Sequence, residues 1–267
     1  MEDLKEKAAA LRRMIIELSC QTRTSHLGSA LSCADILLAA YNGGLRISPE
    51  EASHPERDRL VFSKGHCALA LVCALSQRGF CTFEHLLEKF NRPGGLQEHP
   101  GFPYVPGVEN ASGSLGHGLP LGLGMAAAAR IGQMNYRVCV VMGDGECNEG
   151  SVWEAAMLAP ALGLNNLCVV VDFNRWQATG RSCEITRLEP LAEKWSAFGW
   201  RSVECDGHDP ERLRDLLTAF GQEDRPTAII AHTVKGKGVS FMEDDNNWHY
   251  RIPNAEEAQA ALKELDR

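Results

Sequence analysis

Apolar residues recur along this chain at two spacings, and each spacing predicts a different kind of element. In residues 3–22 they recur every three or four positions, which is the spacing of one face of a helix. Four shorter runs are apolar throughout and rich in β-branched residues, which is typical of strands buried on both sides. We therefore expect helices over residues 3–22, 36–41, 66–78, 151–162, 188–198 and 209–220, and strands over 137–142, 167–172, 201–205 and 227–231.

Capping residues mark several of these helix ends. A side-chain acceptor before a helix satisfies free amide groups, and a glycine after it can take the left-handed conformation that closes the last turn. A further amphipathic helix is expected near the end of the chain, around Ala258, Ala261 and Leu262. The capping signals are Ser32 with Asp35 as a capping box before residue 36, Gly43-Gly44 and Gly79 after the second and third helices, and Asp209 with Pro210 at the start of the 209–220 helix.

The order of these elements predicts an α/β fold. Each of the first three strands is followed by a helix, and strands that are apolar throughout predict a parallel sheet with helices on both faces. No repeat or low-complexity segment divides the chain, so we expect a single domain over residues 1–267. Residues 91–115, 173–186 and 233–254 show no element, and the last two follow strands. Long loops are usually functional, and ligands of open α/β sheets bind at the carboxyl edge, so we expect the site there.

The composition excludes several classes of protein. With 44% hydrophobic and 23% charged residues among 267, the chain matches ordinary globular proteins and not disordered, collagen-like or coiled-coil ones. The net charge of −8 argues against nucleic acid or an anionic membrane as a partner, because both need clustered Lys and Arg. Residues 1–7 carry charges of both signs with no apolar stretch behind them, so we expect neither a signal peptide nor a membrane anchor, and a cytoplasmic protein.

The ten cysteines favour buried thiols over disulfides. Most of them lie within apolar runs and none forms a C-x-x-C pair, so we expect neither a disulfide framework nor a zinc site. Cys147 differs from the others because it lies in a glycine-rich turn beside Glu146. It is the cysteine whose reactivity we would test.

Polar residues follow two of the predicted strands and suggest a metal and phosphate site. Gly143-Asp144-Gly145 follows the first strand, and two glycines around an Asp let the backbone turn tightly and bring amide groups close to an anion. As a bare tripeptide this is more often a plain turn. Asn174 follows the next strand, 30 residues after Asp144, and could simply cap a turn. If the strands are neighbours, both side chains meet at one edge, where their oxygens would suit Mg²⁺ bound together with phosphate.

The spacing of Gly-Asp-Gly and Asn resembles the signature of thiamine diphosphate enzymes, and further motifs resemble transketolase in particular. The resemblance extends over nearly the whole chain. The matching segments are His26-x-Gly28 with Ser32-x-Ala34-Asp-Ile-Leu, Arg57-Asp-Arg59, Ser63-Lys-Gly-His66, Leu96-Gln-x-His99-Pro100, Pro106-Gly-Val-Glu109, Ser112-Gly-Ser-Leu-Gly116-x-Gly118, Glu149-Gly-Ser-Val-Trp-Glu-Ala, Val234-Lys-Gly-Lys-Gly-Val and Trp248-His249.

The resemblance implies thiamine diphosphate and Mg²⁺, or Ca²⁺ or Mn²⁺ in its place, as cofactors. It assigns the metal to Asp144, Asn174 and the backbone oxygen of Trp176. The resemblance also implies that four histidines line the channel that holds the diphosphate and the sugar. Imidazole suits this role, because it titrates near neutrality and can donate to or accept from a hydroxyl. The residues implied to contact thiamine diphosphate are His66, Gly113, Leu115, Gly143, Asp144, Gly145, Glu149, Asn174 and His249, and the implied catalytic residues are His26, His66, His99, His249 and Glu149.

Several positions keep a second interpretation. Glu149 begins a predicted helix, so it either matches the helix dipole or, as in the family, lies at a dimer interface and connects active sites. Lys235 and Lys237 are either solvated loop charges or screen phosphate. A single histidine more often has a structural role. Only the occurrence of four histidines at family positions favours a role in the active site. The chain departs from the family pattern at Ser25, Leu27, His117 and Tyr250, which puts the usual sugars in doubt more than the reaction type.

The implied activity is transfer of a two-carbon ketol unit from a ketose to an aldose, or between their phosphates. Full-length transketolases continue into a pyrimidine-binding domain and a third domain, for which we find no candidate in this chain. The resemblance therefore implies the N-terminal subunit of a split transketolase, active with a partner chain in a heterotetramer. Alternatives are half of a 1-deoxyxylulose 5-phosphate synthase, the α chain of a 2-oxoacid dehydrogenase, or a non-catalytic thiamine diphosphate-binding subunit. A magnesium-dependent phosphatase is disfavoured, because no nucleophilic Asp motif is present.

Overall fold

Five parallel strands form the centre of the protein in the computed structural model, which describes residues 4–101 and 105–266. Their order across the sheet is β1-β2-β3-β5-β4, which confirms the predicted parallel sheet. The second and third strands are neighbours, and Gly143 pairs with Asp172 at their carboxyl ends. The strands are β1 (Arg59–Phe62), β2 (Val138–Gly143), β3 (Leu167–Phe173), β4 (Arg201–Asp206) and β5 (Thr227–His232).

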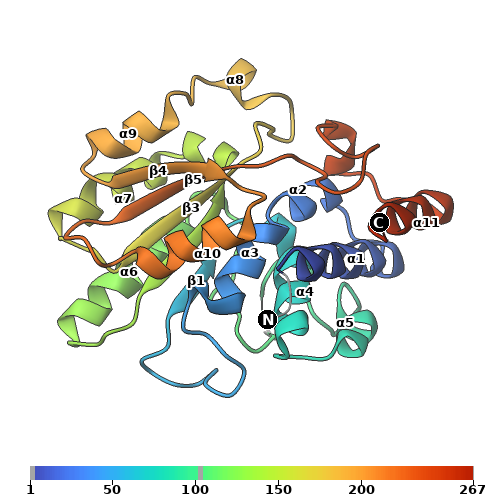
Figure 1. The fold of residues 1–267 in the computed structure, drawn as a ribbon, viewed down its shortest axis with the longest axis horizontal. Coiled ribbons are helices and arrows are strands. Elements are labelled where there is room, and N and C mark those ends of the chain that lie inside the picture. Colours follow the sequence, from blue (N-terminus) through green and yellow to red (C-terminus); the bar gives the residue numbers. More distant parts are fainter. Residues whose placement is uncertain (1–3, 102–104, 267) are drawn as a thin grey trace.

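Helices cover both faces of the sheet (Figure 1). Successive strand residues point to opposite faces, so Val141 packs into a core formed with α1, α3, α4 and α10, whereas Val140 packs into a second core with α6, α7 and α9. These two cores confirm the predicted α/β fold class. The helices are α1 (Leu4–Thr22), α2 (Leu27–Ser32), α3 (Ala34–Ala39), α4 (Ala68–Arg78), α5 (Phe83–Lys89), α6 (Gly118–Ile131), α7 (Gly150–Ala161), α8 (Ser182–Ile185), α9 (Leu191–Ala197), α10 (Pro210–Ala219) and α11 (Ala255–Glu264).

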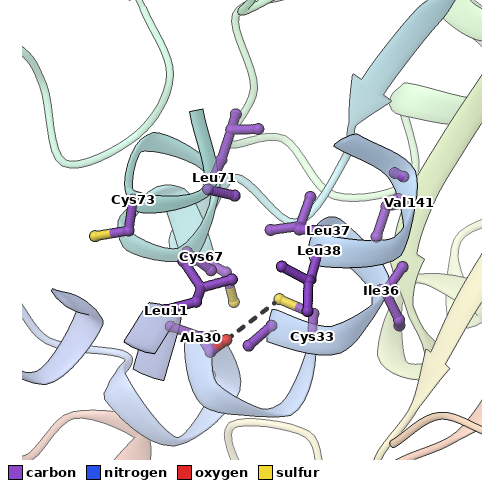
Figure 2. Packing of buried hydrophobic residues seen from close by; sticks show 14 of the residues in the cluster. Leu11, Ala30, Cys33, Ile36, Leu37, Leu38, Cys67, Leu71, Cys73 and Val141 are labelled. Atoms are coloured by element: carbon purple, nitrogen blue, oxygen red, sulfur yellow. Dashed lines mark hydrogen bonds between the residues drawn. The ribbon is translucent and has the colours of Figure 1, made fainter. Parts of the chain in front are cut away.

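Small side chains let α2, α3 and α4 pack closely in the first core (Figure 2). Cys33 lies between α2 and α3, where its thiol donates to the carbonyl oxygen of Ala30 over 3.5 Å. Cys67 and Leu71 belong to the same cluster. Six of the ten cysteines are buried, which agrees with the prediction that most are buried thiols.

Most predicted helix ends agree with the structure. The Asp209 side chain accepts from the amide of Arg212 at the start of α10, and Gly79 closes α4 in the left-handed conformation. The C-terminal helix is α11. Residue 3, where the first helix was expected to begin, lies outside the described residues, as do residues 1 and 2 of the charged N-terminus. Within the described ranges, no helix combines the length and apolarity needed to cross a bilayer.

The predicted capping box at Ser32 and Asp35 is wrong. Residue Cys33 precedes α3 and no side chain caps that helix. The Ser32 hydroxyl donates instead to Asp172 over 2.6 Å, and the Asp35 carboxylate binds Arg12. Both side chains are engaged by distant residues, and these contacts override the local capping preference.

The short helices α2 and α8 were not predicted, and α8 lies within residues 173–186, where no element was expected. Strand β1 and helix α6 next to the site were also missed. Strand β1 is only four residues long and follows a charged segment, so its apolar run is too short to show a period. Helix α6 contains three glycines and Pro120, which predict turns, yet its Ala126 and Ala129 are fully buried. Tertiary packing outweighs the local preference in β1 and α6.

The expectation that every strand is buried on both sides fails for β4. This strand forms the edge of the sheet, and Glu204 and Asp206 on it are exposed. An edge strand has one neighbour, and polar side chains along it are a common protection against pairing with other chains. The central strands β2 and β3 are buried at every position, as predicted.

A buried ion pair fixes the loop that follows β5. The Arg12 guanidinium and the His208 ring both donate to the Asp35 carboxylate, His208 over 2.8 Å. The amide of Val234 donates to His208 Nε2 over 2.8 Å, and Arg12 Nε donates to the carbonyl oxygen of Lys237 over 3.0 Å. The three side chains thus hold residues 234–237 against α1 and α3.

We expect this cluster to make stability depend on pH in the acid range. Burial opposes ionisation of Asp35, but hydrogen bonds from His208 and Arg12 outweigh it and hold the pKa of this carboxyl below its usual value. The stabilisation is therefore complete above the unfolded-state pKa of about 3.9 and is lost as pH falls through the lower folded-state value. Urea unfolding at a series of pH values is expected to show a shallower acid decline for Asp35→Asn than for the wild type. Equal declines would contradict this assignment.

Candidate active site

The carboxyl ends of β2 and β3 open into a cavity of about 370 Å³. Residues from the turn after β2, the loop after β3 and the segment after β5 all line it. The predicted convergence of Asp144 and Asn174 at one edge of the sheet is confirmed, because both line this cavity. All predicted site residues line it as well except His99, whose ring centroid lies 6.3 Å from that of His26.

A buried carboxylate holds the glycine-rich turn in place. Residues 144–148 form a 3₁₀ turn after β2, and the Glu146 side chain accepts from the amides of Gly143 over 2.8 Å and Gly116 over 3.0 Å. The Ser63 hydroxyl at the end of β1 also donates to it. Glu146 thus ties three segments together at the site. It was not predicted as a site residue, although it follows Gly-Asp-Gly directly in the sequence.

Asp144 is buried with little to balance its charge. Its carboxylate is 1% exposed and accepts one side-chain hydrogen bond, from the Ser182 hydroxyl over 2.7 Å. It forms no ion pair with any of the residues that the structure describes. Burial raises the pKa of this carboxyl to about 7. A cation in the cavity would therefore meet a carboxylate that lacks a charged partner.

The amide of Asn174 is oriented by the residues beneath it. Its Nδ2 donates to Ser32 Oγ and to Asp172 Oδ2, each over 3.3 Å, and this fixes which way Oδ1 faces. The Oδ1 atom accepts from the amide of Trp176 over 3.0 Å, so the side chain does cap a turn. An amide oxygen has two lone pairs, and one remains for a second partner.

Three histidines, His26, His66 and His249, line one end of the cavity. The ring centroid of His26 lies 5.4 Å from that of His66 and 5.0 Å from that of His249, and the rings of His66 and His249 are stacked at 5.9 Å. Residue His26 has a φ of 65°, which costs energy for a residue with a side chain. Its amide donates to the carbonyl oxygen of His249 over 2.9 Å, which holds this conformation.

The comparisons with known proteins agree with this geometry. A family model described as "Transketolase, thiamine diphosphate binding domain" matches residues 4–265. The chain belongs to the transketolase family. A relative from Phocaeicola vulgatus, named as one of the subunits of an apulose-4-phosphate transketolase, is 38% identical over 99% of this chain and 94% of its own length. A Clostridium relative, named 6-deoxy-6-sulfo-D-fructose transketolase subunit SqwG, is 37% identical over 99% of this chain and 97% of its own.

Longer transketolases contain a region similar to this chain. Human transketolase is 34% identical over 99% of this chain, which spans 42% of the human protein. The solved transketolase of Campylobacter jejuni superposes with a TM-score of 0.91 at 28% identity, covering all of this chain and 43% of that one. The fold is therefore that of the thiamine diphosphate-binding α/β domain of transketolases.

The cavity fits the cofactors that this transketolase domain implies. Asp144 offers a buried carboxylate oxygen, Asn174 an amide oxygen and Trp176 a backbone carbonyl at one side of it, and oxygen ligands are those that Mg²⁺ prefers. Gln177 Nε2 is buried there without a hydrogen-bond partner among the described residues, which leaves a donor for an anion. The described ranges contain no cluster of three His, Cys, Asp or Glu side chains that could hold a metal, so a metal bound by Asp144 would also need amide, backbone and phosphate oxygens.

The buried pair of Lys64, which lines the cavity, and Asp172 was not predicted from the sequence. The Lys64 ammonium donates to the Asp172 carboxylate and, over 3.1 Å, to the carbonyl oxygen of Ser29. Both charged side chains are less than 2% exposed. Lys64 lies within a motif that carried the family resemblance, whereas Asp172 ends an apolar strand. Their separation in the sequence hides the pair.

The structure places the three other residues that had two interpretations, Lys235, Lys237 and Glu149, in different surroundings. Lys235 is fully buried and its ammonium donates to His249 Nδ1 over 2.9 Å, so it is not a solvated loop charge. Lys237 forms an ion pair with Glu243 at the surface, away from the cavity lining. Glu149 precedes α7, is exposed and lines the cavity mouth, where both of its interpretations remain predictions.

The positions that depart from the family pattern lie in different surroundings. The Ser25 hydroxyl contacts His26 directly, and Tyr250 lines the cavity with 64% of its surface exposed. Leu27 is fully buried in the first core, so the departure from the family pattern at this position affects the packing of that core. His117 precedes α6 and lines a different cavity with Ser114 and Pro120. Ser25 and Tyr250 are therefore the departures best placed to affect a bound sugar.

Cys147, which the sequence analysis singled out for a reactivity test, is placed as an inert thiol. It is 2% exposed, and burial together with Asp144 and Glu146 raises its thiol pKa well above the usual value. Cys183 is the exposed cysteine of the ten. We expect brief treatment of the folded protein with iodoacetamide to alkylate Cys183 before Cys147, as read by peptide mass spectrometry. A Cys183→Ser variant should lose the early label, and early labelling of Cys147 would contradict the structure.

Proposed function

We propose that this chain is the diphosphate-binding subunit of a split thiamine diphosphate-dependent transketolase. The observation that carries the proposal is the cavity itself, in which a buried acid, an amide oxygen and a group of histidines meet at the carboxyl edge of the transketolase fold. The relatives of similar length that it matches are named as transketolase subunits. The proposed reaction is transfer of a two-carbon ketol unit from a ketose phosphate, or a similarly charged ketose, to an aldose phosphate.

The side chains divide into two groups by what they can hold. We assign a divalent cation, Mg²⁺ by the preference of its oxygen ligands, to Asp144, Asn174 and the Trp176 carbonyl. Gly143 and Gly145 bring backbone close to the diphosphate, and Gly113 and Leu115 border the far end of the cofactor. When bound, thiamine diphosphate supplies an electron sink for the electron pair released as a carbon–carbon bond breaks.

The histidines would hold the sugar next to the cofactor. Burial lowers the pKa of His26 and His66, and it lowers that of His249 to about 3, so all three rings are neutral at physiological pH. A neutral imidazole has one donor and one acceptor nitrogen, which suits hydrogen bonds to hydroxyl and carbonyl oxygens. His99 supports His26 from outside the lining, and Glu149 stands at the cavity mouth.

A partner chain completes the proposed enzyme. Relatives of the same extent carry subunit names, and this chain spans only 42% of human transketolase. Helices α6 and α7 pack together and expose apolar side chains, among them Leu121 at 41% and Met157 at 53%. Such a face is typical of a protein interface. We propose that a chain with the pyrimidine-binding domain covers it, in a cytoplasmic heterotetramer of two copies of each chain.

A panel of donors tests the reaction type. The chain, mixed with its candidate partner, thiamine diphosphate and Mg²⁺, is given xylulose 5-phosphate or pyruvate as donor and ribose 5-phosphate as acceptor. We expect a seven-carbon ketose phosphate from xylulose 5-phosphate and no carbon dioxide from pyruvate. Carbon dioxide release from pyruvate would favour a deoxyxylulose phosphate synthase or a 2-oxoacid dehydrogenase. Cofactor binding without turnover on any phosphorylated or sulfonated ketose would favour a non-catalytic subunit.

A further inference from the structure

Two neighbouring histidines of the cavity each contact a partner through Nδ1. The two partners play opposite roles in the hydrogen bond, one as acceptor and one as donor. The rings of His26 and His249 have centroids 5.0 Å apart. His26 Nδ1 lies 2.9 Å from the Ser25 hydroxyl, and His249 Nδ1 lies 2.9 Å from the Lys235 ammonium. Because an imidazole cannot donate and accept at one nitrogen, each partner decides which ring nitrogen carries the proton.

Glu98 decides the direction of the bond between Ser25 and His26. The Ser25 oxygen lies 3.1 Å from Glu98 Oε1, and a carboxylate accepts hydrogen bonds without donating any. The serine hydroxyl has one proton, and the contact with Glu98 uses it. The serine oxygen must then accept from His26, so His26 carries its proton on Nδ1. Its Nε2 keeps a free lone pair, and among the described residues that nitrogen makes no hydrogen bond.

Lys235 imposes the reverse arrangement on His249. An ammonium donates without accepting, so His249 Nδ1 is the acceptor and the ring proton lies on Nε2. Asn246 Oδ1 accepts a second hydrogen bond from the same ammonium over 2.6 Å, which holds it in position. The ammonium remains the major form at neutral pH, because burial lowers the pKa of Lys235 to about 8 and no further.

We propose that Ser25 and Glu98 fix His26 as a hydrogen-bond acceptor and that Lys235 fixes His249 as a hydrogen-bond donor toward a bound ketose. This inference rests on the proposed function and adds what each ring does there. A ketose presents a carbonyl oxygen, which accepts, next to hydroxyl groups, which donate. As a donor, His249 can hydrogen-bond to the carbonyl oxygen. As an acceptor, His26 can receive a hydrogen bond from a neighbouring hydroxyl. Ser25, Glu98 and Lys235 are positioning residues in this arrangement, because they act through the histidines.

The charged and titratable groups around the pair are consistent with two neutral rings. Glu98 favours the protonated form of His26, whereas burial, His99 and Lys235 oppose it, and the net effect lowers the pKa of His26. Burial and the nearby Lys235, His26 and Lys64 lower that of His249. Only a neutral imidazole has two tautomers, because the charged ring carries a proton on both nitrogens. Both rings are neutral near pH 7, so each can adopt one defined tautomer.

Nitrogen NMR of the chain labelled with ¹⁵N-histidine reads these tautomers directly. We would record long-range proton–nitrogen spectra about one pH unit above the ordinary histidine pKa of about 6.5, and assign the two rings with His26→Gln and His249→Gln variants. The wild type is expected to show a protonated Nδ1 with a bare Nε2 for His26, and the reverse for His249. A bare Nδ1 at His26, or a protonated Nδ1 at His249, would overturn the proposal.

Matched variants separate positioning from general packing. Glu98→Ala should shift His26 toward the other tautomer, and Ser25→Ala should shift it less, because Glu98 Oε1 lies 3.8 Å from His26 Nδ1 and still attracts its proton. Glu98→Gln keeps an acceptor oxygen for Ser25 and should preserve the wild-type pattern. Lys235→Met should release His249 and leave His26 as it was. An unchanged His26 spectrum in both alanine variants would overturn the role of Ser25 and Glu98, and an unchanged His249 spectrum in Lys235→Met would overturn that of Lys235.

Activity provides a second and independent readout. With the partner present, Ser25→Ala is expected to lower kcat for ketol transfer at least about tenfold, and Glu98→Gln to restore most of it relative to Glu98→Ala. The NMR result needs no turnover, so the tautomers can be confirmed even if ketol transfer is never found. Ketol transfer with wild-type spectra that show the wrong tautomers would reject this inference and leave the proposed function standing.

Discussion

Replacing Asp144 with alanine is expected to lower the affinity for thiamine diphosphate in the presence of Mg²⁺ by more than about a hundredfold and to abolish ketol transfer. The carboxylate is the only charged group among the three oxygens assigned to the cation, and altering even the support of a metal ligand costs ten- to about a hundredfold. Isothermal titration of the purified chain, with its partner present if binding requires it, measures the loss.

The structure also predicts that this variant folds well. Asp144 is buried with neutral donors only, the Ser182 hydroxyl and the Gly145 amide, so the charged side chain costs stability in the cation-free protein. Without cofactors, Asp144→Ala should therefore melt at the same temperature as the wild type or higher. With Mg²⁺ and thiamine diphosphate the wild type should gain stability and the variant should not. Ser182→Ala, which keeps the carboxylate, is the matched control and should retain binding. Equal cofactor affinity for Asp144→Ala and the wild type would remove Asp144 from the metal site.

Breaking the buried Lys64–Asp172 pair is expected to have the largest effect on stability. In Asp172→Ala the Lys64 ammonium and the Ser32 hydroxyl keep one acceptor, the carbonyl oxygen of Ser29, while Thr233 loses its acceptor. Removing one partner of a buried pair costs about 3–5 kcal/mol. Urea unfolding of the chain measures this loss of free energy.

The opposite variant provides an internal control. In Lys64→Met the Asp172 carboxylate still accepts from Ser32, Thr233 and Asn174, so we expect a smaller loss than in Asp172→Ala. The double variant should be less destabilised than the sum of the two single ones, because it leaves no unpaired charge. Equal and additive losses would contradict the paired arrangement. Asp172 also orients the Asn174 amide, so its loss should weaken cofactor binding in the molecules that remain folded.

The sequence predicted the parts of the site whose signals are local. Gly-Asp-Gly and Asn174 each follow an apolar strand, and successive parallel strands are often neighbours, so their meeting at one edge could be inferred without coordinates. The same reasoning located the parallel sheet and both of its helical layers. The four histidines were found through family resemblance, because a lone histidine carries no such signal.

What the sequence did not predict depends on contacts between distant residues. Lys64 and Asp172 are 108 positions apart, and neither shows a partner in its own neighbourhood. The capping box at Ser32 failed because its hydroxyl donates to the same Asp172, 140 positions away. Helix α6 was missed because glycines that predict turns serve there to bring the helix close to β2, where a side chain at Gly122 would meet Val140. Contacts of this kind arise only once the chain has folded.

The most direct test of the central claim compares ketol transfer by the chain alone, by its candidate partner alone and by the mixture, each with thiamine diphosphate and Mg²⁺. The account predicts a seven-carbon ketose phosphate from xylulose 5-phosphate and ribose 5-phosphate in the mixture only, and none when the chain carries Asp144→Ala. Transfer by the chain alone would contradict the split enzyme. A mixture that binds the cofactor but transfers no two-carbon unit from any phosphorylated or sulfonated ketose would contradict transketolase activity itself.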